Sequence, residues 1–255
     1  MKYLVIFSAL LLITGCGPET DTPSVDYQYE AWLSAVRKPI TIPEGSTGDT
    51  ITTRNFYIIM DGSGSMHDAL DTECSGDKTF STKMEGAQWA LIQFLDSVPE
   101  DVNLGFYLFD NNGEREVVPL GANNRDQIRQ AVEQIQEGGS TPLADAMALA
   151  TQKLVKQYQK QLGYGEFRII VVTDGIANSI PDAALYAAES GMPIYTIGLC
   201  VGSNHPLRKY SVSYKAADNF QDLASGLKET LAELEQFDAD TYDANESDEV
   251  PSPAN

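Results

Sequence analysis

The stretch YIIMDGSGSMHD, residues 57–68, joins an apolar run to an aspartate and then alternates glycine with serine. Its first four residues are typical of a buried strand. Asp61, Ser63 and Ser65 follow at every second position. In a locally extended loop alternate side chains point the same way, and the intervening glycines permit a tight backbone path. The stretch therefore predicts a strand that ends in a cluster of oxygen-bearing side chains.

Short apolar runs, rich in β-branched and aromatic residues, recur between residues 54 and 237. Near-continuous runs of this length suit strands that are covered on both faces, as in a parallel sheet. A weaker run at 115–120 follows the turn signal DNNG, which predicts an antiparallel hairpin. The parallel strands are expected at 55–60, 103–109, 167–173 and 193–199.

Between these strands, apolar residues recur at helical spacing. The spacing predicts amphipathic helices over Met84–Val98, Ile128–Ile135 and Leu143–Tyr158, and a last helix from Phe220 to Leu234. Strand–helix alternation with one hairpin indicates an α/β fold. We expect a three-layer sandwich, in which helices cover both faces of a mostly parallel central sheet with one antiparallel edge strand.

The order of elements predicts where the polar side chains meet. In an open parallel sheet, sites lie at the carboxyl ends of the strands. Asp174, in the segment VVTDG, follows the strand expected at 167–173 and should lie near Asp61. The stretch GGSTPL at 138–143 begins a helix and adds Thr141, with Ser140 as the alternative hydroxyl.

Two carboxylates and three hydroxyls are thus expected at one edge of the sheet. A set of hard oxygen ligands with few carboxylates suits Mg2+ or Mn2+ better than Ca2+. The residues expected to hold the cation are Asp61, Ser63, Ser65, Thr141 and Asp174.

These ordered motifs, D-x-S-x-S, Gly-Gly-x-Thr-Pro-Leu and T-D-G, resemble a von Willebrand factor type A (VWA) domain with a metal-ion-dependent adhesion site. The resemblance implies that the two serines bind the cation directly and the threonine directly or through water. It implies that the two aspartates act through waters and hydrogen bonds. It further implies that the cation accepts a Glu or Asp side chain of a protein partner, which is recognition rather than catalysis.

The same residues argue against several enzyme and calcium sites. A phosphotransferase with an aspartate nucleophile needs a second acid at Ser63. A calcium loop of the EF-hand type needs glycine and an acid at the positions of Met66 and Thr72. The sequence contains neither the phosphate-binding motif G-x-x-x-x-G-K-[ST] nor a G-x-S-x-G elbow. Enzymatic activity is therefore not expected.

Residues 1–15 are typical of a secretory signal, with a basic start, a short apolar core and small residues at its end. The ending ITGC resembles a bacterial lipobox. The resemblance implies that Cys16 is acylated and anchors the protein to a membrane of the bacterial cell envelope, and Gly17 resembles the pattern of outer-membrane sorting. A buried cysteine beside an apolar strand is the alternative.

Composition divides the rest of the chain into three parts. Residues 16–52 predict a tether with a segment that docks on the domain, and residues 53–237 the globular domain. Residues 238–255 carry six acidic residues and no basic one, which predicts an acidic disordered tail. The net charge of −20 argues against nucleic acid as a partner.

Cys74 and Cys200 allow one disulfide in an oxidising compartment, with two buried free thiols as the alternative. The bridge would pin the loop at 71–82 over the expected cation site, which makes this loop a candidate for partner specificity. A second class of function stays open, a structural or regulatory lipoprotein in which the cation only stabilises the fold.

Overall fold

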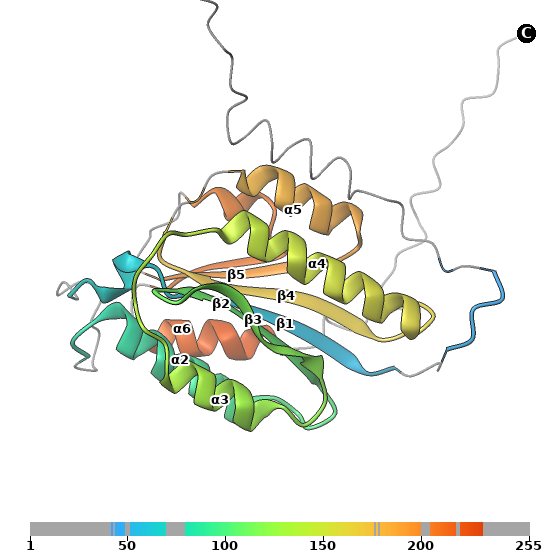
Figure 1. The fold of residues 1–255 in the computed structure, drawn as a ribbon, viewed down its shortest axis with the longest axis horizontal. Coiled ribbons are helices and arrows are strands. Elements are labelled where there is room, and N and C mark those ends of the chain that lie inside the picture. Colours follow the sequence, from blue (N-terminus) through green and yellow to red (C-terminus); the bar gives the residue numbers. More distant parts are fainter. Residues whose placement is uncertain are drawn as a thin grey trace, which may run out of the picture.

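The computed structural model describes residues 42, 44–48, 52–69, 80–175, 177, 179–199, 205–217 and 220–231. Within these residues, six strands form one central sheet with helices on both faces (Figure 1). The strands are β1 Arg54–Asp61, β2 Asn103–Asp110, β3 Gly113–Gly121, β4 Glu166–Thr173, β5 Ile194–Leu199 and β6 Ser213–Ala217.

The order of the strands in space is β3-β2-β1-β4-β5-β6. Every neighbouring pair is parallel except β2 and β3, which form an antiparallel hairpin at one end of the sheet. The chain moves outward from β1 in one direction through β3 and in the other direction through β6. The predicted three-layer α/β fold with one antiparallel edge strand is confirmed.

The helices divide between the two faces of the sheet (Figure 1). One face is covered by α4 Leu143–Lys160 and α5 Ile180–Glu189. The other face is covered by α2 Lys83–Ser97, α3 Arg125–Glu133 and α6 Phe220–Glu229. Two short 3-10 helices, η1 Gly64–His67 and η2 Pro206–Lys209, lie in connections after β1 and β5.

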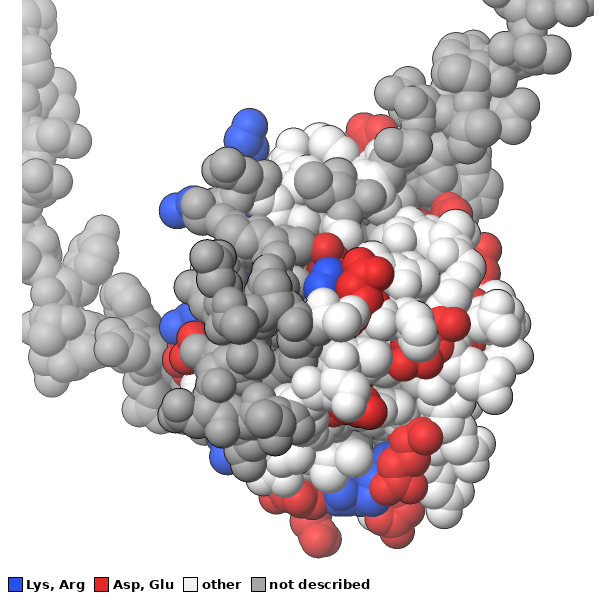
Figure 2. Space-filling model, turned by 90° about the vertical axis from the view of Figure 1, so that its left-hand side faces the viewer, with Lys and Arg blue, Asp and Glu red and all other residues white. Residues whose placement is uncertain are grey.

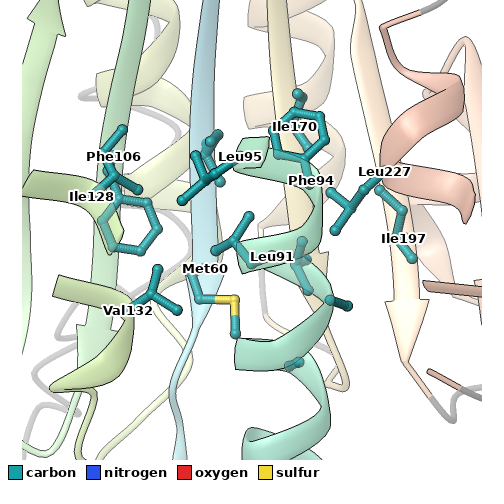
Figure 3. Close-up of a cluster of buried hydrophobic side chains, with 14 of the residues drawn as sticks. Met60, Leu91, Phe94, Leu95, Phe106, Ile128, Val132, Ile170, Ile197 and Leu227 are labelled. Carbon is teal, nitrogen blue, oxygen red and sulfur yellow. The ribbon is translucent and has the colours of Figure 1, made fainter. Parts of the chain in front are cut away.

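The central strand β1 is buried on both sides because alternate side chains enter different cores. Phe56, Ile58 and Met60 pack with α2, α3 and α6, whereas Tyr57 and Ile59 pack with α4 and α5. Figure 3 shows the first cluster, in which apolar side chains of α2 lie against β1. Burial on both faces explains why the residues of β1 form a continuous apolar run in the sequence.

Two elements were not predicted from the sequence, α5 and β6. Helix α5 has the sequence IPDAALYAAE, in which alanines fill most of the buried positions and give little amphipathic contrast. Strand β6 has the sequence SYKAA at the end of the sheet, without an apolar run.

Two of the predicted helices end earlier than expected. Helix α3 ends at Glu133, because Gln136 turns away to exchange hydrogen bonds with the β2–β3 hairpin. Helix α6 ends at Glu229, before the predicted position Leu234, which lies outside the described residues.

We call the side on which β1, β2, β4 and β5 end the carboxyl edge. At this edge β1 lies between β2 and β4, where the order of strands changes direction, and such a point is the usual site position of an open α/β sheet. Figure 2 faces this side of the molecule, and acidic side chains are spread over its described surface with fewer basic ones among them.

Candidate metal centre

Asp61 is the last residue of β1, and its side chain is fully buried at the carboxyl edge. Its Oδ1 accepts a hydrogen bond of 2.9 Å from the backbone N–H of Ser63, the local turn that aspartate favours. Its Oδ2 accepts a hydrogen bond of 2.6 Å from the hydroxyl of Thr173, at the end of β4. The carboxylate is therefore fixed from both of the strands that meet there.

The two serines lie together, but not for the reason that the sequence suggested. Ser63 is extended, with φ −60° and ψ 172°, whereas Ser65 lies in the 3-10 helix η1. The prediction of an extended loop is wrong beyond Ser63, because the backbone N–H groups of Met66 and Asp68 bond back to the carbonyls of the serines. The turn still leaves the two Oγ atoms 3.2 Å apart.

The glycine pair Gly138–Gly139 lies against the loop that follows β1. Gly138 donates its N–H to the carbonyl of Gly62 at 2.9 Å, and Gly64 donates to the carbonyl of Gly139 at 3.4 Å. Both residues of the pair have positive φ, which favours glycine. The sequence therefore needs glycines here to bring the two loops into contact.

This contact brings Thr141 to the site. Its Oγ1 and Oδ2 of Asp61 each lie 3.8 Å from the position that a Cβ would take on Gly175. Thr141 is half-buried, whereas the neighbouring Ser140 is exposed. The position favours Thr141 over the alternative hydroxyl.

Asp174 follows β4 directly and is also buried. Its Oδ1 accepts a hydrogen bond of 2.7 Å from the hydroxyl of Ser65. Its Oδ2 lies 2.8 Å from Nζ of Lys83, the first residue of α2. The structure thus brings together all of the predicted oxygen ligands and adds an ammonium group that the sequence reasoning missed.

Thr173 and His205 are two further residues of the site that were not predicted. Nε2 of His205 lies 2.7 Å from the carbonyl of Gly175, and its Nδ1 accepts a hydrogen bond from the N–H of Leu207. These contacts hold the loop that carries Asp174. Thr173 belongs to the TDG motif and could have been recognised there. No short motif marks His205, because its partner Gly175 lies 30 positions earlier in the chain.

The electrostatics of the site favour a cation. Burial raises the pKa of the Asp61 carboxyl, although hydrogen bonds from Ser63 and Thr173 act in the opposite direction. The charge of nearby Asp174 also raises it. Lys83 is paired with Asp174, whereas the groups that donate hydrogen bonds to the Asp61 carboxylate, the N–H of Ser63 and the hydroxyl of Thr173, carry no charge.

The side chains fit a hard divalent cation. All five predicted ligands offer oxygen, the atom that Mg2+ and Mn2+ prefer. Among the described residues, no group of three or more His, Cys, Asp or Glu side chains is placed to hold a metal ion. A cation at the carboxyl edge would therefore depend on the hydroxyls of Ser63, Ser65 and Thr141.

Asp110, at the end of neighbouring β2, belongs to the hairpin and not to this site. Arg115 binds both of its oxygens, at 2.7 and 3.2 Å, and the N–H groups of Asn112 and Gln136 add hydrogen bonds. Burial raises the pKa of Asp110, but these hydrogen bonds and the charge of Arg115 outweigh it, and the pKa is lowered.

Several predictions fall on residues outside the described part of the chain. These are Cys16, Cys74 and Cys200, the signal segment 1–15, most of the tether 16–52 and the tail 238–255. Among the described residues, no helix combines the length and the apolar character needed to cross a membrane.

Comparisons with known proteins agree with this fold. The pilus adhesin SpaC from Lactobacillus rhamnosus GG aligns with 73% of this chain and 31% of its own, at 15% identity and a TM-score of 0.54. The manganese-loaded TRAP protein of Plasmodium vivax aligns with 71% of this chain and 74% of its own, at 19% identity and a TM-score of 0.51.

The vWF domain of the type V pili tip protein Mfa5 from Porphyromonas gingivalis aligns with 71% of this chain and 95% of its own, at 10% identity and a TM-score of 0.50. At identities this low, the structural likeness shows a shared fold and nothing more. No curated protein sequence matches the chain.

The model of the von Willebrand factor type A domain matches residues 55–235, which include every strand and helix described above except Arg54, the first residue of β1. The chain therefore belongs to the von Willebrand factor type A domain family.

Proposed function

We propose that this protein is a lipid-anchored VWA module that binds Mg2+ or Mn2+ at the carboxyl edge and uses it to capture an acidic side chain of a protein partner. The observation that carries the proposal is the position of the Ser65 hydroxyl, which lies 3.2 Å from the hydroxyl of Ser63 and donates to Asp174 at 2.7 Å. A linker or a lone turn would not require residues 109 positions apart to converge.

Each residue has a distinct task in this proposal. The hydroxyls of Ser63 and Ser65 would hold the cation directly, and Thr141 would join them from the glycine loop. Asp61 and Asp174 would balance the charge and keep the serines in place through hydrogen bonds. When bound, the cation supplies an electrophilic position for a carboxylate oxygen of the partner.

The proposal is of recognition rather than catalysis. The Ser65 hydroxyl donates to Asp174, and His205 is engaged by the carbonyl of Gly175, so neither forms a nucleophile–base pair with the other. Two structural neighbours, a pilus adhesin and a pili tip protein, agree with an adhesion module. The manganese-loaded neighbour agrees with a divalent cation.

The location is proposed from the sequence. We place the mature protein in the bacterial cell envelope, at the outer membrane, anchored through acylated Cys16 with residues 16–52 as its tether. A Cys74–Cys200 disulfide would fasten the loop beside the cation site, where partner choice would be decided. The globular domain would span residues 53–237, and residues 238–255 would form an acidic tail.

Calorimetric titration with Mg2+ and Mn2+ tests the cation site. Wild type should bind either ion, whereas Thr141→Ala should bind more weakly, because it loses one ligand. Ser140→Ala is the matched control, since Ser140 is exposed and adjacent, and it should bind like wild type. Equal affinities of the two variants would remove Thr141 from the site.

Capture of a partner tests the rest of the proposal. Wild type and Thr141→Ala are used as baits for envelope extract, with Mg2+ or with EDTA. Partners retained by wild type with Mg2+ should be lost in EDTA and on the Thr141→Ala bait. Partners that remain under both conditions, while the cation still stabilises the fold, would instead favour the structural or regulatory lipoprotein.

A further inference from the structure

The contact between Lys83 and Asp174 places a charge of the protein itself at the proposed cation site. Nζ of Lys83 lies 2.8 Å from Oδ2 of Asp174 and 3.9 Å from Oδ2 of Asp68. The side chain of Asp174 has no exposed surface, and that of Lys83 is 18% exposed. The pair is therefore largely shielded from water. Ion pairs in such surroundings are stronger than those on an exposed surface.

The backbone fixes where this ammonium group begins. Lys83 donates its N–H to the carbonyl of Asp68 at 3.3 Å, and the next residues outward, Ala69 and Thr82, form an antiparallel bridge. Thr82 also caps α2 by accepting the N–H of Glu85. The start of α2 is thus attached to the end of the loop that carries the two serines.

Both oxygens of Asp174 are occupied in this arrangement. Oδ1 accepts the Ser65 hydroxyl and Oδ2 accepts the Lys83 ammonium group. A divalent cation held by Ser65 and balanced by Asp174 would lie close to this ammonium group, and the two positive charges would repel. The ammonium group and the cation therefore compete for the same carboxylate.

We propose that Lys83 is an internal competitor of the divalent cation, and that cation binding moves its ammonium group from Asp174 to Asp68. The inference rests on the proposed cation site. Asp68 is suited to receive the group because it is already 3.9 Å away and its side chain is 67% exposed. The flexible stem of lysine allows the exchange without movement of the α2 backbone. Lys83 thereby lowers the affinity of the site for the cation and stabilises the domain without it.

The test compares full-length wild type with Lys83→Met and Lys83→Arg. Methionine keeps an apolar stem without the charge, and arginine keeps the charge as the matched control. Calorimetry with Mg2+ and with Mn2+ measures affinity, and urea unfolding in EDTA measures stability without a cation. Lys83→Gln is prepared alongside, so that a failure of Lys83→Met to fold leaves a second neutral variant.

The neutral variants should bind the cation about tenfold more tightly than wild type, the size of a moderate coupling between sites. In EDTA they should unfold at lower urea, because the buried carboxylate of Asp174 loses its counterion. Lys83→Arg should stay near wild type in both measurements. Asp68→Asn should bind the cation more weakly than wild type, because the displaced ammonium group loses its second partner.

Three results decide on the inference and on the proposed function. Cation binding by wild type, with equal or weaker binding by both neutral variants, would overturn the role of Lys83 and leave the cation site standing. No binding of Mg2+ or Mn2+ by wild type or any variant would overturn both. Binding by the neutral variants alone would support the competition strongly.

Discussion

The hydroxyl of Thr173 donates a hydrogen bond of 2.6 Å to Oδ2 of Asp61, joining the ends of two neighbouring parallel strands inside the protein. The same hydroxyl accepts the N–H of Gly175 at 3.1 Å. One small side chain thus fixes both the carboxylate of the first motif and the turn that carries Asp174.

Replacing Thr173 by valine keeps the shape of the side chain and removes this hydroxyl. Thr173→Val should lower the free energy of unfolding by about 2 kcal/mol, because a buried carboxylate and a backbone N–H each lose a partner. Thr173→Ser keeps the hydroxyl and is the control. Urea unfolding in EDTA measures the difference, and a Thr173→Val variant as stable as wild type would show that these hydrogen bonds do not stabilise the domain.

Neutralising Asp61 should separate stability from cation binding. Burial raises the pKa of Asp61, so the ionised carboxylate is less favourable in the folded protein than in the unfolded chain at neutral pH. Asp61→Asn retains an acceptor for the N–H of Ser63 and removes the charge. In EDTA this variant should be as stable as wild type or more so, and Mg2+ should no longer stabilise it.

Wild type should gain about 2.7 kcal/mol from Mg2+ at a hundredfold excess over the dissociation constant. Unfolding curves with Mg2+ and with EDTA check both statements. An Asp61→Asn variant that Mg2+ stabilises as much as wild type would show that this carboxylate does not contribute to the cation site.

The two glycines of DGSGS should differ in their tolerance of a side chain. A Cβ on Gly62 would lie 2.8 Å from the carbonyl oxygen of Phe109 and 3.0 Å from Cβ of Asp110, whereas the nearest atom to a Cβ on Gly64 is 3.9 Å away. Gly62→Ala should therefore destabilise the domain by about 1–3 kcal/mol. Gly64→Ala should be neutral or stabilising by up to about 1 kcal/mol. Urea unfolding of the two variants shows whether each glycine is needed because a side chain would clash with its neighbours or only because of its backbone conformation.

The buried imidazole of His205 should make stability fall in mild acid. Burial lowers the pKa of His205 below the usual 6.5, against the opposing effects of the Gly175 carbonyl and of Asp61. Above pH 6.5 the imidazole is neutral in both states. As the pH falls below this value, the unfolded chain takes up a proton first, so stability is lost until the folded pKa is reached.

His205→Gln cannot titrate, and its free energy of unfolding should fall less than that of wild type between about pH 7 and pH 5. His67→Gln is the control, because His67 is exposed and this variant keeps the buried imidazole of His205. The variants must be compared with each other, because Asp61, whose pKa is raised, changes the free energy of unfolding with pH in the opposite direction. A wild-type slope in His205→Gln would assign the acid sensitivity to other groups.

The strands that could be predicted most clearly from the sequence are those whose successive side chains are buried. Strands β1, β2 and β4 are buried at all but their first residue, so their apolar runs were plain. Helix α5 and strand β6 were missed because alanine and polar residues carry no strong periodicity. Their place is decided by tertiary packing, α5 against α4 and β6 against β5.

The site was predictable where side chains follow strands directly. Asp61 and Asp174 could be placed together because neighbouring parallel strands end on one side. The contact of Lys83 with Asp174 could not be predicted, because it depends on the bridge that attaches the start of α2 to the loop after β1. The 3-10 turn at Ser65 was hidden for a similar reason, since alternation of glycine and serine fits an extended loop equally well.

The bridge between Ala69 and Thr82 has a consequence for how this family member can diverge. It closes the base of residues 70–81, so the domain fixes both ends of this segment regardless of what lies between them. Doubling the length of a flexible loop adds only about 0.6 kcal/mol of closure entropy. The length and sequence of this segment can therefore change at little cost to the stability of the domain, while the residues proposed to hold the cation stay the same.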